Sequence, residues 1–160
     1  DEGKENLFAG RCDVYTTDAS GLSSTRAAAA DPSKWLVLPE IISKEPLGPL
    51  VRHGDHQWGD VVRWSLNAMI IAEELGITSE NVDASKGSNV PEVLRLLGVE
   101  GSYGEMLELA PDWAYQIIKQ IGNYSESYEA NVGPDTPLEI ARGLNALWTQ
   151  GGILYAPPFR

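Results

Sequence analysis

Asp18 is the residue of this sequence whose type and position most strongly suggest chemistry. Residues 12–17, CDVYTT, predict a strand because such side chains fit a pleated, half-buried surface. A helix is predicted next, from about Ser20 to Ala30. Ligands of open α/β sheets bind where strands end, and a carboxylate there can accept charge-assisted hydrogen bonds from an ammonium group. The same carboxylate can cap the helix. Spacing alone favours the cap and leaves both roles open.

Two threonines precede Asp18 and are weaker candidates for contact with a ligand. Side chains alternate along a strand, so Thr16 is predicted on the same side as Asp18 and Thr17 on the opposite side. Threonines in strands are more often structural than functional. We keep Thr16 and Thr17 as candidate ligand-binding residues that rank behind Asp18.

The remaining reactive side chains do not form a known catalytic or metal-binding motif. His53, Asp55 and His56 suggest a metal site, but no third strong ligand is near, and a turn that caps the next helix is favoured. Cys12 is the only cysteine and is interpreted as a small buried strand residue. Nucleophile elbows, HExxH, CxxC and phosphate-binding glycine loops do not occur in the sequence. We therefore expect no catalytic residue, no bound metal and no cofactor.

Composition limits the classes of partner. The 160 residues include 12 basic and 23 acidic side chains, which gives a net charge of -11. Such a charge repels phosphate backbones, so nucleic acid is not an expected partner. The sequence contains no apolar run of the length that spans a membrane, and residues 1–10 do not read as a signal peptide. A soluble globular domain is the expected class.

Strands and helices are both predicted around these residues. A second short strand, residues 34–39, follows the helix after Asp18, and a third, residues 49–52, follows a connector rich in proline and glycine. The apolar pattern then predicts a long helix over residues 57–75, with Asp55 as its N-cap and Gly76 as its end. Shorter helices are predicted farther along, at residues 91–98, 111–122, 124–131 and 136–151. The predicted fold class is α/β, with a sheet too small for the chain, as in half of a larger protein.

Several segments resemble one known family over nearly the whole sequence. They are AGRCDVYTTDASGL, VLPEIISKEPLGPLVRHGD, GNYSESYEANVG and ARGLNALWTQGGILYAPPFR. With these segments the chain resembles the C-terminal half of periplasmic amino-acid-binding proteins of ABC transporters, the solute-binding protein family 3. It looks most like the branch that binds L-amino acids in general. The resemblance implies part of a type II periplasmic-binding fold, in which two lobes close on a ligand.

The resemblance gives Asp18 a specific role. In this family the last acid of a G-R-x-D-x-x-x-x-D pattern binds the α-ammonium of the amino acid, and that acid is Asp18 here. Gly10, Arg11 and Asp13 match the earlier positions of the pattern. The resemblance therefore favours ligand binding by Asp18, although one side chain can serve as anchor and cap together.

The resemblance also implies a division of the chain into four parts. Residues 1–40 would be the end of lobe two, and residues 41–48 a hinge or crossover segment. Residues 49–76 would return into lobe one, and residues 77–160 would be a helical extension that packs on lobe one. Ile41 to Glu45 would hold a hinge strand, with hinge residues Ile42, Ser43, Lys44 and Glu45 absorbing the change in dihedral angles as the lobes close.

Function and partners follow from the same resemblance. It implies a substrate-binding component of an ABC importer in the periplasm, which captures an L-amino acid and delivers it to permease subunits in the inner membrane. The family's residues for the ligand carboxylate have no counterpart here, so we expect this chain alone to bind amino acids weakly or not at all. Uncovered lobe surfaces would also allow a homodimer. The alternative is a self-associating structural module that binds no small ligand.

Overall fold

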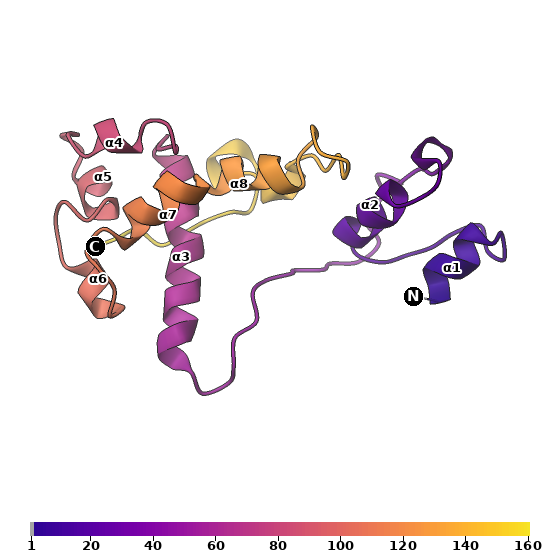
Figure 1. Cartoon of the computed structure of the whole chain (residues 1–160), viewed down its shortest axis with the longest axis horizontal. Helices are drawn as coiled ribbons and strands as arrows, with labels where there is room; N and C mark the ends of the chain where they lie inside the picture. Colours follow the sequence, from indigo (N-terminus) through magenta and orange to yellow (C-terminus); the bar gives the residue numbers. More distant parts are fainter. Residues whose placement is uncertain (1) are drawn as a thin grey trace. The chain divides into compact units, whose positions relative to one another are not determined.

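The computed structural model describes residues 2–160, and the regular structure within them is helical (Figure 1). The α-helices are α1 (Glu2–Phe8), α2 (Ala19–Ala27), α3 (His56–Glu74), α4 (Val82–Ser85), α5 (Pro91–Leu96), α6 (Tyr103–Met106), α7 (Trp113–Ile121) and α8 (Tyr124–Asn131). Three short 3₁₀ helices accompany them: η1 (Pro32–Lys34), η2 (Gly143–Asn145) and η3 (Trp148–Gln150).

The chain forms two compact units. The first contains the residues up to Gly48 together with Asn131–Ala141, and the second contains Pro49–Ala130 and Arg142–Arg160. The chain therefore passes from one unit to the other at three places along the sequence.

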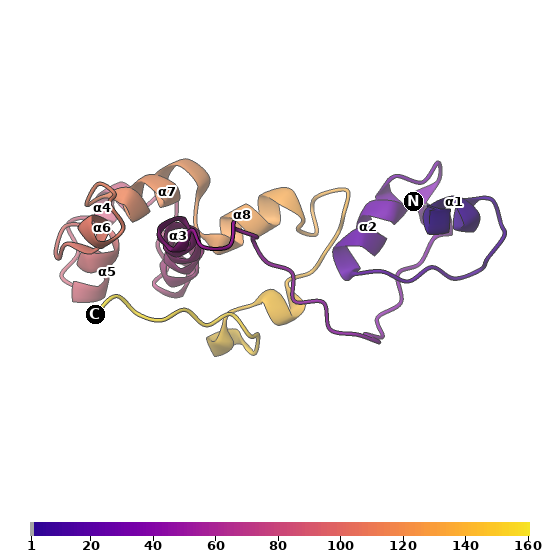
Figure 2. The same ribbon diagram turned by 90° about the horizontal axis from the view of Figure 1, so that it is seen from below.

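The second unit holds a continuous hydrophobic core around α3. Helix α7 packs across α3, and α4 and α5 lie beside them (Figures 1 and 2). Ile118 of α7 and Val82 of α4 are fully buried in this core, because the apolar faces of several short helices meet there. The C-terminal segment closes the core with Phe159, whose ring stacks on Trp64 with centroids 5.2 Å apart.

The ends of α3 confirm the prediction made for the long helix. Asp55 is its N-cap and accepts a hydrogen bond from the Trp58 N–H at 3.2 Å. At the other end Gly76 has a φ of 68°, the left-handed conformation that ends a helix. The predicted helices at residues 91–98, 111–122 and 124–131 are confirmed as α5, α7 and α8.

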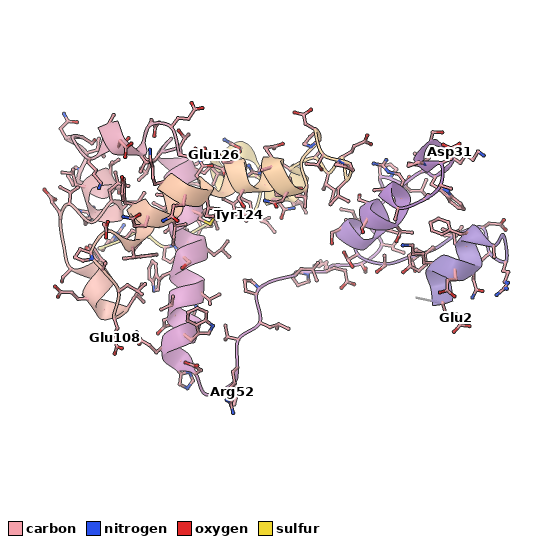
Figure 3. All side chains as sticks on the ribbon, viewed as in Figure 1. Glu2, Asp31, Arg52, Glu108, Tyr124 and Glu126 are labelled. Carbon is pink, nitrogen blue, oxygen red and sulfur yellow. The ribbon has the colours of Figure 1, made fainter. Side chains whose placement is uncertain are left out.

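A reciprocal pair of hydrogen bonds fixes the start of α8. The Glu126 carboxylate accepts from the Asn123 N–H at 2.8 Å, and the Asn123 side chain accepts from the Glu126 N–H at 3.0 Å. This is the capping-box arrangement. Glu126, labelled in Figure 3, also accepts from the Ser79 hydroxyl at 2.6 Å and so ties α8 to the loop after α3.

The first unit has almost no core of its own. Helix α2 occurs where a helix was predicted, yet Leu7 is the only buried hydrophobic side chain of this unit among the described residues. Phe8 meets Trp35 edge to face with centroids 5.2 Å apart, and little else is enclosed. A unit with so small a core needs further elements to cover its apolar side chains.

The predicted strands are wrong for the described chain. Residues 12–17, 34–39 and 49–52 carry no ladder hydrogen bonds, and the described residues contain one isolated bridge, Leu147 with Leu154. Leu36 and Leu50, which a sheet would bury, are 80% and 98% exposed. A strand exists only beside a partner strand, and residues 2–160 supply none. The α/β character is therefore not seen in this chain by itself.

The helix predicted over residues 136–151 is also wrong. Glu139 has a left-handed φ of 52°, which interrupts a helix, and the Ile140 N–H donates to the Val132 carbonyl. Arg142 instead binds Glu73 of α3. Contacts with other elements thus outweigh local helix propensity here, and only η2 and η3 remain helical.

Among the described residues, no helix has both the length and the apolar character that a membrane crossing would require.

Candidate ligand-binding site

Asp18 is the N-cap of α2, so the cap that the spacing favoured is confirmed. Its Oδ1 accepts hydrogen bonds from the Gly21 N–H, at 2.8 Å, and from the Ser20 hydroxyl. Its Oδ2 receives only a long contact of 3.4 Å from the Thr17 hydroxyl. One carboxylate oxygen is therefore engaged in the cap while the other retains capacity to accept a hydrogen bond.

The same hydrogen bonds keep the Asp18 carboxylate charged. The Ser20 hydroxyl, and after it the Gly21 N–H, lower the pKa of Asp18 below its ordinary value. The side chain is only partly buried, so a ligand can reach it. An ionised carboxylate with a free oxygen at this position is suited to bind an ammonium group.

Gly21 allows the close approach of the residues around Asp18. A Cβ atom at this position would lie 2.9 Å from Thr17 Cγ2 and 3.0 Å from Asp18 Oδ2. Any larger residue would push on both side chains. Sequence reasoning did not single out Ser20 or Gly21; the signal that could have identified them is the Asp-x-Ser-Gly run at a helix start.

The two threonines differ from the expectation. Thr17, predicted on the opposite side from Asp18, is the threonine that contacts it, while Thr16 is exposed. The reason is that residues 12–17 do not form a strand, so strict alternation of side chains does not apply. A ligand role for Thr16 and Thr17 stays a prediction.

The predicted hinge residues lie in an extended, exposed segment. Ile42 is 81% exposed, and the Ser43 hydroxyl donates to the Glu45 carboxylate at 3.1 Å. This segment ends at Gly48, the last residue before the chain enters the second unit. A hinge role for Ile42, Ser43, Lys44 and Glu45 stays a prediction.

The other residues considered from sequence do not assemble into a site. In the described part of the chain, no group of three or more histidine, cysteine or carboxylate side chains could hold a metal ion. Asp55 caps α3, as the favoured interpretation of that loop required. Cys12 was expected in a buried strand, but it is a partly exposed free thiol in irregular backbone.

The hydrogen bonds to Asp18 give a testable prediction about its titration. We expect the Asp18 carboxyl to titrate below the ordinary range of aspartate, and Ser20→Ala to raise its pKa, because the hydroxyl stabilises the charged form. Since the pKa is lowered in the folded state, the stability from this cap is present above the unfolded pKa and is lost as the pH falls through the folded pKa. Carbon NMR of the carboxyl groups measures the titration. An unchanged Asp18 midpoint in Ser20→Ala would contradict the assignment.

Comparison with known proteins finds relatives of one class. The chain is homologous to part of the periplasmic amino-acid-binding proteins of ABC transporters, as the sequence resemblance predicted. It is 56% identical over 160 residues to the glutamate/glutamine/aspartate/asparagine-binding protein BztA of Rhodobacter capsulatus. The aligned region covers 99% of this chain and 47% of BztA. It is 58% identical over 154 residues to the general L-amino acid-binding periplasmic protein AapJ of Rhizobium johnstonii, covering 95% of this chain and 45% of AapJ.

Two further relatives agree. The putative amino-acid ABC transporter-binding protein YhdW of Escherichia coli is 55% identical over 162 residues, covering 100% of this chain and 47% of YhdW. A solved structure of an ABC transporter periplasmic binding protein from Brucella ovis, with glutathione bound, matches with a TM-score of 0.93 and 52% identity, covering 99% of this chain and 50% of that chain. No family model matches the sequence.

The relatives differ from this chain in length. It spans about half the length of the curated relatives it matches, which is consistent with the predicted C-terminal half. By their names the relatives are solute-binding proteins and not enzymes. The comparisons give no support to the homodimer that uncovered lobe surfaces would allow.

Proposed function

We propose that this chain is part of the substrate-binding component of an ABC importer for L-amino acids. The observation that carries the proposal is identity of 55–58% to amino-acid-binding proteins across nearly the whole chain. BztA is named for four particular amino acids and AapJ for L-amino acids in general, so the preferred substrate of this chain is left open. The mechanism is capture of the ligand between two lobes, without catalysis.

Asp18 is the proposed anchor for the ligand's α-ammonium group. The proposal is supported by its lowered pKa and by an Oδ2 atom that has only one long contact. L-Amino acids and the γ-glutamyl end of glutathione share this ammonium group, which fits a site that recognises the part common to them. Thr17, whose hydroxyl contacts Asp18 Oδ2, is the proposed second residue in contact with the ligand, and Thr16 is a weaker candidate.

The proposed lobes follow the two units. Residues 1–40 are assigned to lobe two, residues 41–48 to the crossover, and residues 49–76 to lobe one; the change of unit after Gly48 supports this division. Residues 77–160, apart from residues 131–141, are the proposed extension of lobe one. Asn131–Ala141 is reassigned to lobe two because it groups with the first unit, where the Glu139 carboxylate pairs with Arg26 at 2.7 Å.

The proposed setting is the periplasm, with permease subunits in the inner membrane as partners. Two of the relatives carry the word periplasmic in their names, and all are described as ABC transporter or amino-acid-binding proteins. Apolar side chains of residues 36–50 are exposed in this chain. We propose that this segment forms strands that pair with strands from the part of such a protein that this chain does not span. A self-associating module is the rival explanation of the same exposed residues.

A chimera tests the proposed function. The region of AapJ that matches this chain is replaced by this chain, and the product is titrated with L-amino acids by calorimetry. We expect specific binding by the chimera and weak or no binding by the isolated chain, because the ligand lies between elements from both parts. The proposal fails if a folded, monomeric chimera binds no amino acid while AapJ binds under the same conditions.

A further inference from the structure

A shallow groove on the second unit has no role in the proposed function. It has a volume of about 190 Å³ and lies between the end of α3, the start of α5 and the C-terminal segment. Figure 2 shows this last segment running back past α3 towards α5. A hydrogen bond of 3.1 Å from Arg95 Nε of α5 to the Phe159 carbonyl holds the segment in place.

The groove has an apolar floor and aromatic walls. Ile71, Ala156 and Phe159 form the floor and are buried. Trp148 and Tyr155 form the walls, keep 51% and 68% of their surface exposed, and meet edge to face with centroids 5.8 Å apart. Large aromatic side chains that are fixed in place and left half exposed are typical of surfaces that bind another molecule.

The charges at the rim have one sign. Glu74 and Glu92 are the acidic residues of the lining, and none of the described residues that line the groove is basic. The Trp148 indole N–H donates to Glu74 Oε1 at 3.1 Å, which orients both side chains. Within residues 2–160, the Glu92 carboxylate makes no hydrogen bond or ion pair. The groove thus combines an apolar floor, aromatic faces and a free carboxylate.

We propose that this groove receives a lysine or arginine side chain from a segment of a partner protein. The alkyl stem would cover the apolar floor, and the cation would lie against the ring of Trp148 and pair with Glu92. Because Glu92 is exposed, an ion pair with a lone cation would contribute little there, so the charge is proposed to arrive on a larger body that adds contacts. A chain with a net charge of -11 attracts such a basic partner. The proposal does not depend on amino-acid binding.

The test is an NMR titration of the isotopically labelled chain with an arginine-containing peptide and with the same peptide carrying neutral citrulline. We expect the arginine peptide to shift the Trp148 indole N–H signal, which Trp148→Phe identifies, and the citrulline peptide to leave it in place. Glu92→Gln should weaken binding roughly two- to fivefold, as for loss of one exposed ion pair. Glu100→Gln, the same change at an exposed position beyond the other end of α5, should leave binding unchanged.

Four results would overturn the proposal. Equal binding of the citrulline peptide would show an apolar groove without charge recognition. Equal binding of free arginine amide would show a site for small cations. Loss of peptide binding in the chimera with AapJ would show that the remainder of the longer protein occupies the groove. No binding of the arginine peptide would leave the groove without the proposed partner.

Discussion

Replacing Arg142 with methionine is expected to destabilise the second unit by about 3 kcal/mol, the lower end of the range for breaking a buried ion pair. Arg142 Nη2 lies 2.9 and 3.0 Å from the two carboxylate oxygens of Glu73, and the side chains are only 16% and 9% exposed. The guanidinium also stacks on Tyr124 and Tyr128, 5.3 Å from each ring centroid. The substitution would leave the Glu73 charge nearly buried without its partner.

Arg63→Met is the matched control for this prediction. Arg63 pairs with Asp60 at 3.5 Å, but the two side chains are 71% and 49% exposed, so the loss should be below about 1 kcal/mol. Urea unfolding of the three proteins measures the free energies. Equal losses for the two variants would mean that the Arg142 pair contributes no more than a solvated one.

Gly98→Ala is expected to cost about 3 kcal/mol or more, from a strained backbone and from a collision. Gly98 has a φ of 70°, and a Cβ atom there would lie 2.0 Å from the Pro111 carbonyl oxygen and 2.6 Å from its carbon. Backbone atoms cannot move aside as the end of a long side chain can. The turn after α5 would have to separate from the segment that leads into α7.

Gly76→Ala separates the two causes. Gly76 has a φ of 68°, and a Cβ atom there would have nothing within 4 Å, so only the backbone strain of about 1–2 kcal/mol remains. The difference between the two variants measures the collision. Similar unfolding midpoints for Gly98→Ala and Gly76→Ala would contradict the close approach of Pro111 to Gly98.

Local sequence signals were sufficient to predict helices whose first and last turns contain capping residues. Asp55 and Gly76 mark the two ends of α3 in the sequence, and the structure uses both. Glu139 and Arg142 carry no such signal. Their positions are set by Arg26 and Glu73, which are far away in sequence, so propensity predicted a helix where the chain is irregular.

The strands show a different limit of sequence reasoning. Leu36, Leu38 and Leu50 have the apolar character that is typical of a buried sheet, and for that reason the sequence predicted strands there. Pairing also needs a second strand, which local pattern cannot supply, and the described chain leaves these residues exposed. The relatives are about twice as long as the aligned region, and the proposed partner strands would lie in the part of such a protein that this chain does not span.

The candidate site was predictable in part. The position of Asp18 before a helix predicted the cap, and only the resemblance to amino-acid-binding proteins gave it a ligand. Ser20 and Gly21 both donate to Oδ1, so this oxygen caps the helix and Oδ2 is left to accept a hydrogen bond from a ligand. That detail requires coordinates, because the same residue order permits either oxygen, or both, to face the helix.

The central claim is that Asp18 binds the ligand's ammonium group in addition to capping α2. Calorimetric titration of the AapJ chimera with an L-amino acid, carrying either Asp18→Asn or Asp31→Asn, tests it most directly. Asp31 is a matched control because it also caps a helix, accepts hydrogen bonds from the Ser33 N–H and hydroxyl, and has a lowered pKa (Figure 3). We predict that Asp18→Asn weakens binding by roughly tenfold to a hundredfold, as for loss of a charge-assisted hydrogen bond, and that Asp31→Asn leaves binding unchanged. Equal affinities of the two variants would contradict the claim and leave Asp18 as a helix cap alone.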